Sequence, residues 1–342
     1  MTLTRIRLAN VEAAFRALSD VGRVEYVRGH VVADGSYSHV QGLAVAPAHL
    51  LFTHSDENRE SGRILIADRA SQEMTGWFAI PPFTIPPEKP FFHHAGGCQL
   101  LGDLLVVACE TGQRDTPRSV VAFFDLTDPT FPREVPQFRI ENRTARAMAA
   151  GITTIERAGR EAFLVAAFEH GCVSFYEFDE LGAHPRQPTF ELCVDEDAHQ
   201  AFLLFTDQQN QVFAVGLNSG GLLGKAKATL YRLERDQTGR AVRLKVVASR
   251  EFETNQGARL RWGATIVVPS EDRMILYCSS RRFDRDPFDN VLSAEHGCTL
   301  NIFEPAPPRR RKTPRRTAKT LASSRVRRQT TGRRRTSPRR SR

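Results

Sequence analysis

The sequence predicts an all-β protein built from copies of one four-stranded unit. Similar apolar segments begin at Gly42, Gly97, Gly151 and Gly263, at spacings of 55, 54 and 112 residues. Each glycine is followed by two β-rich apolar runs that a short polar turn separates, which is typical of a β-hairpin. With 342 residues, of which 41% are hydrophobic, the chain can bury a sizeable core. Self-similarity at this period indicates a repeat architecture.

The interval of 112 residues is close to two periods and predicts a further copy between Gly151 and Gly263. The segment FLLFTDQQNQVFAVGLN, which starts at Phe202, fits the hairpin pattern but has phenylalanine where the other copies have glycine. The sequence therefore predicts five copies.

Each copy continues with further strand-like runs. An alternating apolar run with Phe or Tyr near its end follows every hairpin, and a fourth run closes four copies. The fifth copy stops at Pro305 without a fourth run, whereas GRVEYVRG lies ahead of the first copy, at Gly22–Gly29. We expect this N-terminal strand to pair with the third strand of the last copy and close a ring, because closure removes exposed sheet edges. The third runs cover 63–70, 119–126, 172–179, 228–235 and 298–305, and the fourth runs cover 75–81, 134–140, 188–194 and 244–252.

This pattern resembles a β-propeller, and implies five four-stranded blades closed by an N-terminal strand. The resemblance covers residues 22–305. Residues 1–21 form an N-terminal extension, in which LANVEAAFRAL at 8–18 predicts a short amphipathic helix. The copies lack the Gly-His and Trp-Asp dipeptides of Trp-Asp repeats and a clear kelch diglycine pattern, so the resemblance is to an architecture. An architecture alone does not imply an activity.

The C-terminal segment 306–342 differs sharply in charge from the rest of the chain. From Arg309 onward it holds 16 of the 48 Lys and Arg residues and no acid, which leaves 32 basic and 39 acidic residues before it, a net charge of −7. Its composition predicts a disordered tail. Such a tail would bind nucleic acid or another polyanion through released counterions. The predicted nucleic-acid-binding residues are Arg309, Arg310, Arg311, Lys312, Arg315, Arg316, Arg327, Arg328, Arg333, Arg334, Arg335, Arg339 and Arg340.

The N-terminal residues and the cysteines bear on the compartment. Charged residues interrupt the apolar residues of 1–20, and no apolar run has the length of a secretory signal or a membrane span. We expect no membrane partner and a cytoplasmic location, or a nuclear or nucleoid-associated one if the tail binds DNA. The six cysteines are scattered without a C-x-x-C pair and are expected to be buried free thiols.

Three histidines occupy equivalent positions in the repeat. His39 and His94 lie three residues before Gly42 and Gly97, and His199 lies three residues before Phe202. In a propeller the inner strands begin at one mouth of the central channel, so these side chains are expected to form a ring. Three imidazoles could bind a divalent metal or act as acid and base. The alternative is that they are polar residues lining the channel.

The tetrapeptide Glu-His-Gly-Cys occurs twice, at 169–172 and 295–298, each time directly before a third strand. Its residue types could bind zinc. Because equivalent positions in different blades point in different directions, we interpret the recurrence as an imprint of the repeat. Gly171 and Gly297 are then turn residues with positive φ.

Two functions are compatible with these features. The first is a non-enzymatic scaffold that binds a protein partner on one face of the propeller and has a polyanion-binding tail. The alternative is a metal-dependent hydrolase, lyase or oxidoreductase centred on His39, His94 and His199. Neither identifies a cofactor beyond a divalent metal.

Overall fold

The computed structural model divides the chain into a compact unit, Met1–Ala306, and a second unit, Pro307–Arg342. The residues that it describes all belong to the first unit. They are 6–29, 39–55, 62–83, 94–110, 118–142, 147–179, 187–195, 199–219, 226–281, 283 and 297–305. The tail residues predicted to bind nucleic acid lie outside this set.

The described part of the first unit consists almost entirely of antiparallel strands that follow one another in the sheets, which confirms the all-β prediction. The N-terminal strand is β1 (Arg23–Arg28). The next two sets are β2 (His39–Val45), β3 (His49–Ser55), β4 (Gly62–Asp68) and β5 (Glu73–Ala79), then β6 (His94–Leu101), β7 (Leu104–Glu110), β8 (Ser119–Asp125), β9 (Arg133–Glu134) and β10 (Ile140–Asn142). They are followed by β11 (Ala149–Arg157), β12 (Arg160–Glu169), β13 (Cys172–Phe178) and β14 (Phe190–Cys193), then β15 (Ala201–Thr206), β16 (Val212–Ser219), β17 (Ala226–Arg235) and β18 (Ala241–Phe252), and finally β19 (Arg259–Ser270), β20 (Arg273–Ser279) and β21 (Gly297–Phe303).

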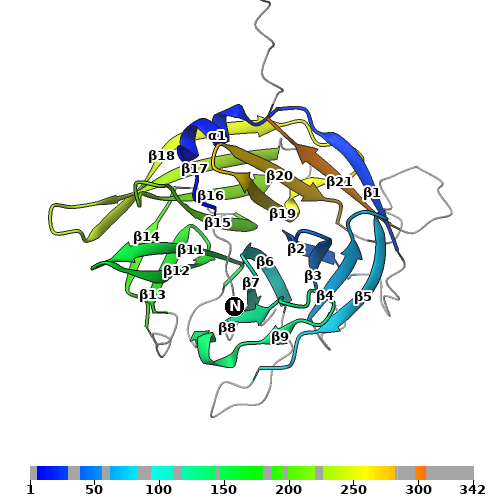
Figure 1. Ribbon diagram of the computed structural model, residues 1–342, viewed down its shortest axis with the longest axis horizontal. Coiled ribbons are helices and arrows are strands. Elements are labelled where there is room, and N and C mark those ends of the chain that lie inside the picture. Colours follow the sequence, from blue (N-terminus) through cyan, green and yellow to red (C-terminus); the bar gives the residue numbers. More distant parts are fainter. Residues whose placement is uncertain are drawn as a thin grey trace, which may run out of the picture. The chain divides into compact units, whose positions relative to one another are not determined.

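The first strands of these sets form a closed ring. Strand β2 contacts β6, β6 contacts β11, β11 contacts β15, β15 contacts β19, and β19 returns to β2. Figure 1 shows these strands nearest the centre, with the later strands of each set farther out. This arrangement is a β-propeller. All the inner strands begin at one end of the ring, so the residues at their starts lie around a common mouth.

The repeat glycines are explained by the close approach of neighbouring inner strands. A Cβ atom on Gly151 of β11 would lie 2.3 Å from the backbone oxygen of Phe202 on β15. One on Gly263 would lie 2.5 Å from the hydroxyl of Ser279 and 3.1 Å from the backbone oxygen of Gly42. Carbon atoms do not pack at the shorter distances, so only glycine lets the strands meet this closely.

The predicted closure by the N-terminal strand is confirmed. Strand β1 pairs antiparallel with β21, from Arg23 opposite Ile302 to Arg28 opposite Gly297. On its other side β1 meets β5 through a single parallel pair, Arg28 and Glu73. The strand that completes the last set therefore comes from the opposite end of the unit.

Hydrophobic residues form the core between neighbouring sheets as well as within them. One cluster joins Leu51 and Ile64 of the first set to Leu105 and Phe124 of the second, all at most 1% exposed. Phe124 also meets Phe78 of β5 edge to face, with ring centroids 6.0 Å apart. Burial of both faces explains why the inner runs are almost continuously apolar.

The predicted fourth strand at 134–140 is only partly correct. The segment contains the two-residue strand β9, a 3₁₀ turn at Pro136–Phe138 and the short strand β10. Both strands pair with β8. Pro136 lacks a backbone N–H and cannot continue a ladder, which explains the interruption.

The expectation of six buried free thiols is wrong for two cysteines. Cys172 and Cys193 are exposed and form a disulfide between β13 and β14. Cys98, Cys109, Cys278 and Cys298 are free and buried. Burial raises the pKa of Cys98 to about 12 and that of Cys298 to about 11, so these thiols are unreactive near neutral pH.

The two glycines of the repeated tetrapeptide have different roles. Gly171 has a φ of 83° in the turn before β13, as expected, and His170 beside it has a φ of 43°. Gly297 lies in β21, where a Cβ atom would meet the ring of Tyr26 at 2.4 Å. The second glycine is therefore required for close packing and is not a turn residue.

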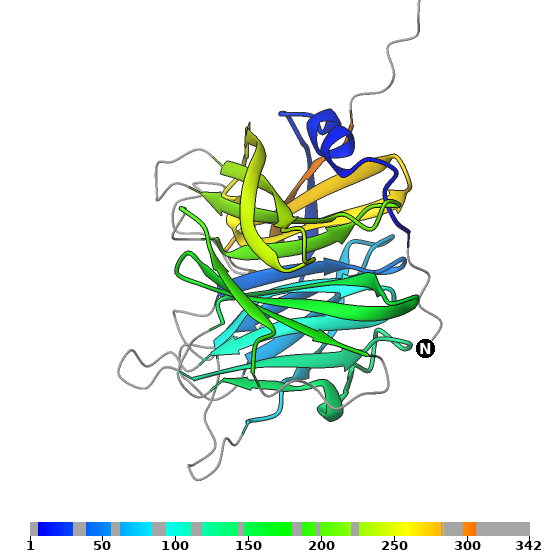
Figure 2. The same cartoon turned by 90° about the vertical axis from the view of Figure 1, so that its left-hand side faces the viewer.

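The N-terminal extension lies against the last two sets of strands. Helix α1 (Val11–Ala17) begins after Asn10, whose side chain accepts a hydrogen bond from the Ala13 amide at 2.8 Å. This confirms the short helix, which Figure 2 shows beside the strands at the top of that view. The guanidinium of Arg250 on β18 donates to the carbonyl oxygens of Phe15, Arg16 and Leu18, so it caps the end of the helix.

The residues before α1 border the end of the ring opposite to the starts of the inner strands. Leu8 pairs with Asp207, and the Ala9 amide donates to Glu271 at 2.7 Å. Ile6, Arg7 and Leu8 line a hollow of about 320 Å³ together with residues from the later halves of the inner strands. This end is therefore partly covered by the chain's own N-terminal segment.

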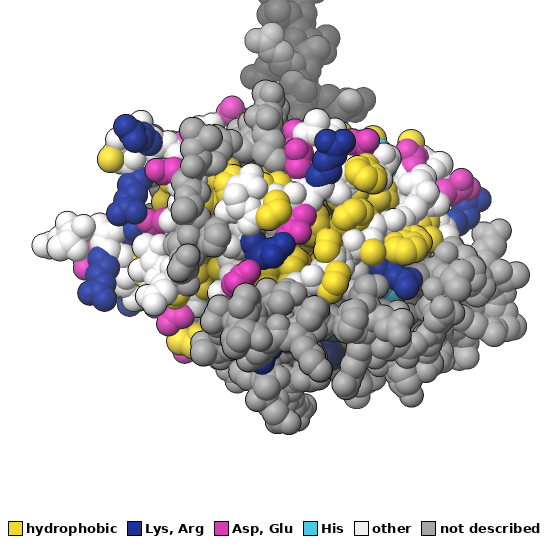
Figure 3. All heavy atoms as spheres, turned by 90° about the horizontal axis from the view of Figure 1, so that it is seen from below, with side chains coloured by type: hydrophobic (Ala, Val, Ile, Leu, Met, Phe, Trp, Pro, Cys, Tyr) yellow, Lys and Arg dark blue, Asp and Glu magenta, His cyan; other side chains and the backbone are white. Residues whose placement is uncertain are grey.

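The surface of the unit carries several large apolar side chains. Trp77 is 55% exposed and Phe131 is 58% exposed. Figure 3 shows hydrophobic side chains gathered on one face among acidic and basic ones. Within the described ranges, no helix is both long and apolar enough to cross a bilayer.

Candidate functional site

The starts of β2 and β6 bring two of the three predicted histidines together. The Nε2 atoms of His39 and His94 lie 3.2 Å apart. Their ring centroids are 5.1 Å apart and the ring planes are inclined at 45°. His39 is buried and His94 is partly exposed. The equivalent repeat positions of the two histidines therefore place their imidazoles in direct contact at one mouth of the ring.

A glutamine and a glutamate lie beside this pair. Gln41 lies two residues after His39 on β2, so both side chains point to the same face of the strand. Its amide nitrogen contacts the Nε2 atoms of His39 and, at 3.1 Å, His94. On the other side of His94, Nδ1 lies 3.5 Å from Oε1 of Glu110, the last residue of β7, but forms no hydrogen bond with a described residue.

His199 does not join the pair. It is fully buried just before β15, where its Nε2 lies 2.9 Å from the hydroxyl of Tyr231 and its ring lies 5.2 Å from that of Phe168. A Cβ atom on Gly216 would meet the His199 ring at 2.4 Å. The imidazole thus packs over Gly216 within its own sheet and not at the mouth.

The predicted metal site of His39, His94 and His199 is therefore not formed. No group of three or more His, Cys, Asp or Glu residues that could hold a metal ion occurs among the described residues. The physical reason is the packing of His199, since the glycine on the neighbouring strand gives its ring space inside the sheet.

Two arginines and a tryptophan complete the described part of this mouth. Trp262 of β19 directly precedes Gly263, and its ring meets that of His39 edge to face at 5.8 Å. The guanidinium carbons of Arg261 and Arg281 lie 4.6 and 5.0 Å from the centroid of the Trp262 ring. The Val40 amide donates to the Arg281 carbonyl at 2.7 Å, which ties Arg281 to the start of β2. The indole thus holds two cations beside the histidine pair.

The positive charge of these arginines is not neutralised by the described residues. Neither Arg261 nor Arg281 forms an ion pair with a carboxylate in the described part of the chain. Burial lowers the pKa of Arg261, and the nearby charges of Arg281 and Arg259 lower it further. Partly buried cations without a carboxylate are costly, so this arrangement favours an anionic ligand.

Buried polar atoms without partners also gather here. Within the described ranges, Oε2 of Glu110 and Nε of Arg281 are buried and have no hydrogen-bond partner. Native proteins rarely leave such atoms unsatisfied unless a ligand, water or function uses them. A ligand at this mouth could contact both a hydrogen-bond donor and an acceptor that the described residues do not satisfy.

The repeat pattern did not predict Arg261, Trp262 and Arg281. The pattern concerns the third position before each repeat glycine, and in the fifth copy this position is Leu260. Trp262 occupies the position directly before Gly263. Because the chain has only two tryptophans, a tryptophan beside a repeat glycine is a signal that could have indicated this site. Arg281 follows the end of β20 and approaches β2 only because the ring closes.

Comparisons with known proteins identify no sequence family. No family model and no curated protein matches the chain. Among solved structures, it is similar to the GH43 endo-arabinanase from Bacillus licheniformis, with 11% identity, a TM-score of 0.46 and coverage of 77% of this chain and 93% of that one. The GH62 α-L-arabinofuranosidase catalytic domain from Coprinopsis cinerea has 9% identity, a TM-score of 0.47 and coverage of 87% and 97%. A hypothetical protein from Leishmania major has 14% identity, a TM-score of 0.43 and coverage of 86% and 94%.

Two of these three similar structures are enzymes by their titles, so the comparisons give no support to the expectation of a non-enzymatic scaffold. The similarity assigns no reaction and no substrate to this chain. The site itself must supply that argument.

Proposed function

We propose that the protein is a hydrolase with its active site at the mouth formed by the starts of β2, β6 and β19, and that it acts on a substrate bearing a carboxylate or phosphate group. The observation that carries this proposal is the contact between the His39–His94 pair and the cationic cluster of Arg261, Trp262 and Arg281. We also propose that the ring has five blades, each begun by one of the five inner strands.

The chemistry assigned to each side chain follows from its neighbours. Glu110 faces Nδ1 of His94 at 3.5 Å, on the side where a carboxylate stands behind a catalytic imidazole. His94 removes a proton from a water molecule, and the hydroxide attacks the substrate atom that carries the leaving group, whose bond to that atom breaks. The proton passes to His39, whose Nε2 lies 3.2 Å away, and then to the leaving group. Arg261 and Arg281 bind the anionic group and hold the substrate in place.

Anion binding at this mouth can be measured through Trp262. The chain contains two tryptophans, so Trp77→Phe leaves Trp262 as the only one. We expect its fluorescence to change saturably when phosphate or acetate is titrated in. Adding Arg281→Gln should weaken that binding by about tenfold, since a hydrogen bond to a charged group contributes about 1.5–3 kcal/mol. An unchanged emission on titration would reject the anion site.

Catalysis is tested with chromogenic substrates that differ in charge. We expect p-nitrophenyl phosphate or p-nitrophenyl glucuronide to be hydrolysed faster than neutral p-nitrophenyl glucoside. His94→Gln should lower kcat by about 100-fold or more, the usual contribution of a general base. His49→Gln is the matched control, because His49 begins β3, whereas the other end of that strand, Ser55, lies opposite His39 at the mouth. Equal rates in the two variants would show that His94 is not the base.

A further inference from the structure

A second cleft lies between the third and fourth sets of strands, away from the histidine pair. Its volume is about 710 Å³. One wall is formed by the turn between β11 and β12, the end of β13, and β14 with the residue before it. The other wall is formed by the turns that join β15 to β16 and β17 to β18. The turns after β11 and β15 follow the ends of inner strands, whereas His39 and His94 lie at the starts of theirs.

Side chains that cross between the two walls fix the shape of this cleft. The side chain of Asn210 accepts a hydrogen bond from the Glu156 amide at 2.8 Å and donates to the Glu156 carbonyl at 3.0 Å. Glu177 of β13 accepts from Arg157 at 2.6 Å and from Arg235 of β17 at 3.4 Å. The side chain of Glu177 is only 7% exposed. The walls are therefore held at a fixed spacing before any ligand binds.

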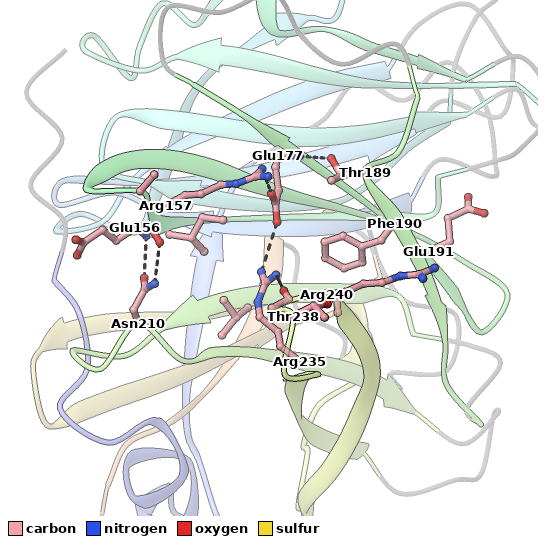
Figure 4. A pocket seen from close by; sticks show the side chains of 15 residues that line it. Glu156, Arg157, Glu177, Thr189, Phe190, Glu191, Asn210, Arg235, Thr238 and Arg240 are labelled. Carbon is pink, nitrogen blue, oxygen red and sulfur yellow. Dashed lines mark hydrogen bonds and ion pairs between the residues drawn. The ribbon is translucent and has the colours of Figure 1, made fainter.

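The cleft carries one guanidinium group that has no carboxylate partner among the described residues. Arg157 and Arg235 share the single carboxylate of Glu177, and Arg240 is the third arginine that lines the cleft. Arg240 has no ion pair, and its guanidinium has no hydrogen-bond partner, within the described ranges. Figure 4 shows Glu156 and Glu191 at opposite ends of the cleft, with Glu177 between them. Counted over the whole lining, three guanidinium groups face three carboxylates, and the Arg240 guanidinium is the one without an ion pair among the described residues.

An aromatic ring lies beside these charges. Phe190 of β14 is half-buried and stacks on Phe175, with ring centroids 4.7 Å apart and ring planes inclined at 19°. Figure 4 shows its ring between Glu177 and Arg240. A ring held in this way offers apolar surface to the carbon skeleton of a ligand whose charged groups contact the arginines.

We propose that this cleft binds a small organic anion, namely a carboxylate or a phosphate monoester with a short carbon chain. Arg240 binds one anionic oxygen pair through its fork of N–H donors, and the outward N–H groups of Arg157 and Arg235 bind any further anionic oxygen. The carbon chain packs on Phe190. This site is separate from the proposed active site, so either can be tested without the other.

The proposal is tested by calorimetric titration of the full chain with succinate, glycerol 1-phosphate and neutral glycerol. We expect saturable binding of succinate, glycerol 1-phosphate or both, and no binding of glycerol. Tighter binding of succinate would indicate a carboxylate ligand, and tighter binding of glycerol 1-phosphate would indicate a phosphate monoester. Arg240→Gln should weaken binding by about tenfold, as loss of a charged hydrogen-bond donor does. Arg243→Gln is the matched control, because Arg243 lies three residues further along the chain, on β18, and pairs with Glu234. The Arg-rich C-terminal segment contributes the same background to every variant.

A second variant predicts a change of the opposite sign. Glu177→Gln removes the carboxylate that occupies Arg157 and Arg235, so anion binding should become tighter by several-fold. Looser binding in Arg240→Gln, with tighter binding in Glu177→Gln, would support the site. Equal weakening by Arg240→Gln and Arg243→Gln, or no saturable binding of either anion, would overturn it. The comparison of the two arginine variants remains decisive if Glu177→Gln does not fold.

Discussion

At the residue scale, the repeat glycines illustrate how a local sequence signal reports a contact distant in the chain. Their spacing predicts the copies, and the structure shows that a Cβ atom at Gly151 would collide with the Phe202 backbone at 2.3 Å. The histidines follow the same spacing, yet only His39 and His94 meet. The position of His199 depends on the space above Gly216 in the same set of strands, about which the spacing between copies carries no information.

This contact predicts opposite effects for two glycine substitutions. Gly151→Ala should destabilise the protein by about 1–3 kcal/mol, the usual cost of overpacking, because backbone atoms on both strands must move. Gly76→Ala on β5 should be neutral or stabilising by up to about 1 kcal/mol, since nothing lies within 4 Å of its Cβ position and alanine restricts the unfolded chain. Urea unfolding of both variants provides the measurement. An equal loss of stability in the two would show that close approach at Gly151 is not the reason for its glycine.

At the element scale, strands could be predicted where an alternating run of apolar residues is bounded by polar turns. The third runs of all five copies correspond to β4, β8, β13, β17 and β21. In the segment 134–140 the apolar residues favour a continuous strand, whereas Pro136 interrupts the ladder of hydrogen bonds. The apolar pattern alone therefore did not predict that the strand is broken. The disulfide between Cys172 and Cys193 was also missed, since it depends on the register that places the two residues opposite each other.

The hairpin of β17 and β18 carries an ion-pair network that predicts a pH dependence. Hydrogen bonds from Arg232 and Arg243 lower the pKa of Glu234 from 4.5 to about 2. A carboxylate whose pKa is lower in the folded state stabilises the fold above pH 4.5, and this contribution is lost as the pH falls toward 2. We therefore expect Glu234→Gln to be less stable than the parent protein at pH 6. The difference should shrink between pH 4.5 and 2. A difference that does not vary with pH in urea unfolding would exclude this linkage.

At the scale of the whole unit, closure of the ring explains both the fold and the position of the candidate site. Closure brings β19 against β2, and so places Trp262 beside His39 although they are far apart in the chain. The sequence predicted the histidines because they repeat, but not their cationic neighbours, because these come from elements that only the closed ring brings together. The pairing of β1 with β21 is the step that completes this closure.

Two substitutions on β1 therefore test the closure. Val27 is fully buried between neighbouring strands, whereas Val24 on the same strand is 40% exposed. Val27→Asp should destabilise the unit by more than about 4 kcal/mol, because it buries an unpaired charge. Val24→Asp should change stability by less than about 0.5 kcal/mol, as exposed substitutions usually do. In thermal unfolding followed by circular dichroism, we expect a large decrease in Tm for the first variant and little change for the second.

Because the mouth depends on closure, Val27→Asp should also weaken anion binding at Trp262 at temperatures well below the Tm of the parent protein. Equal Tm values for the two variants would show that β1 is not required to hold the ring together.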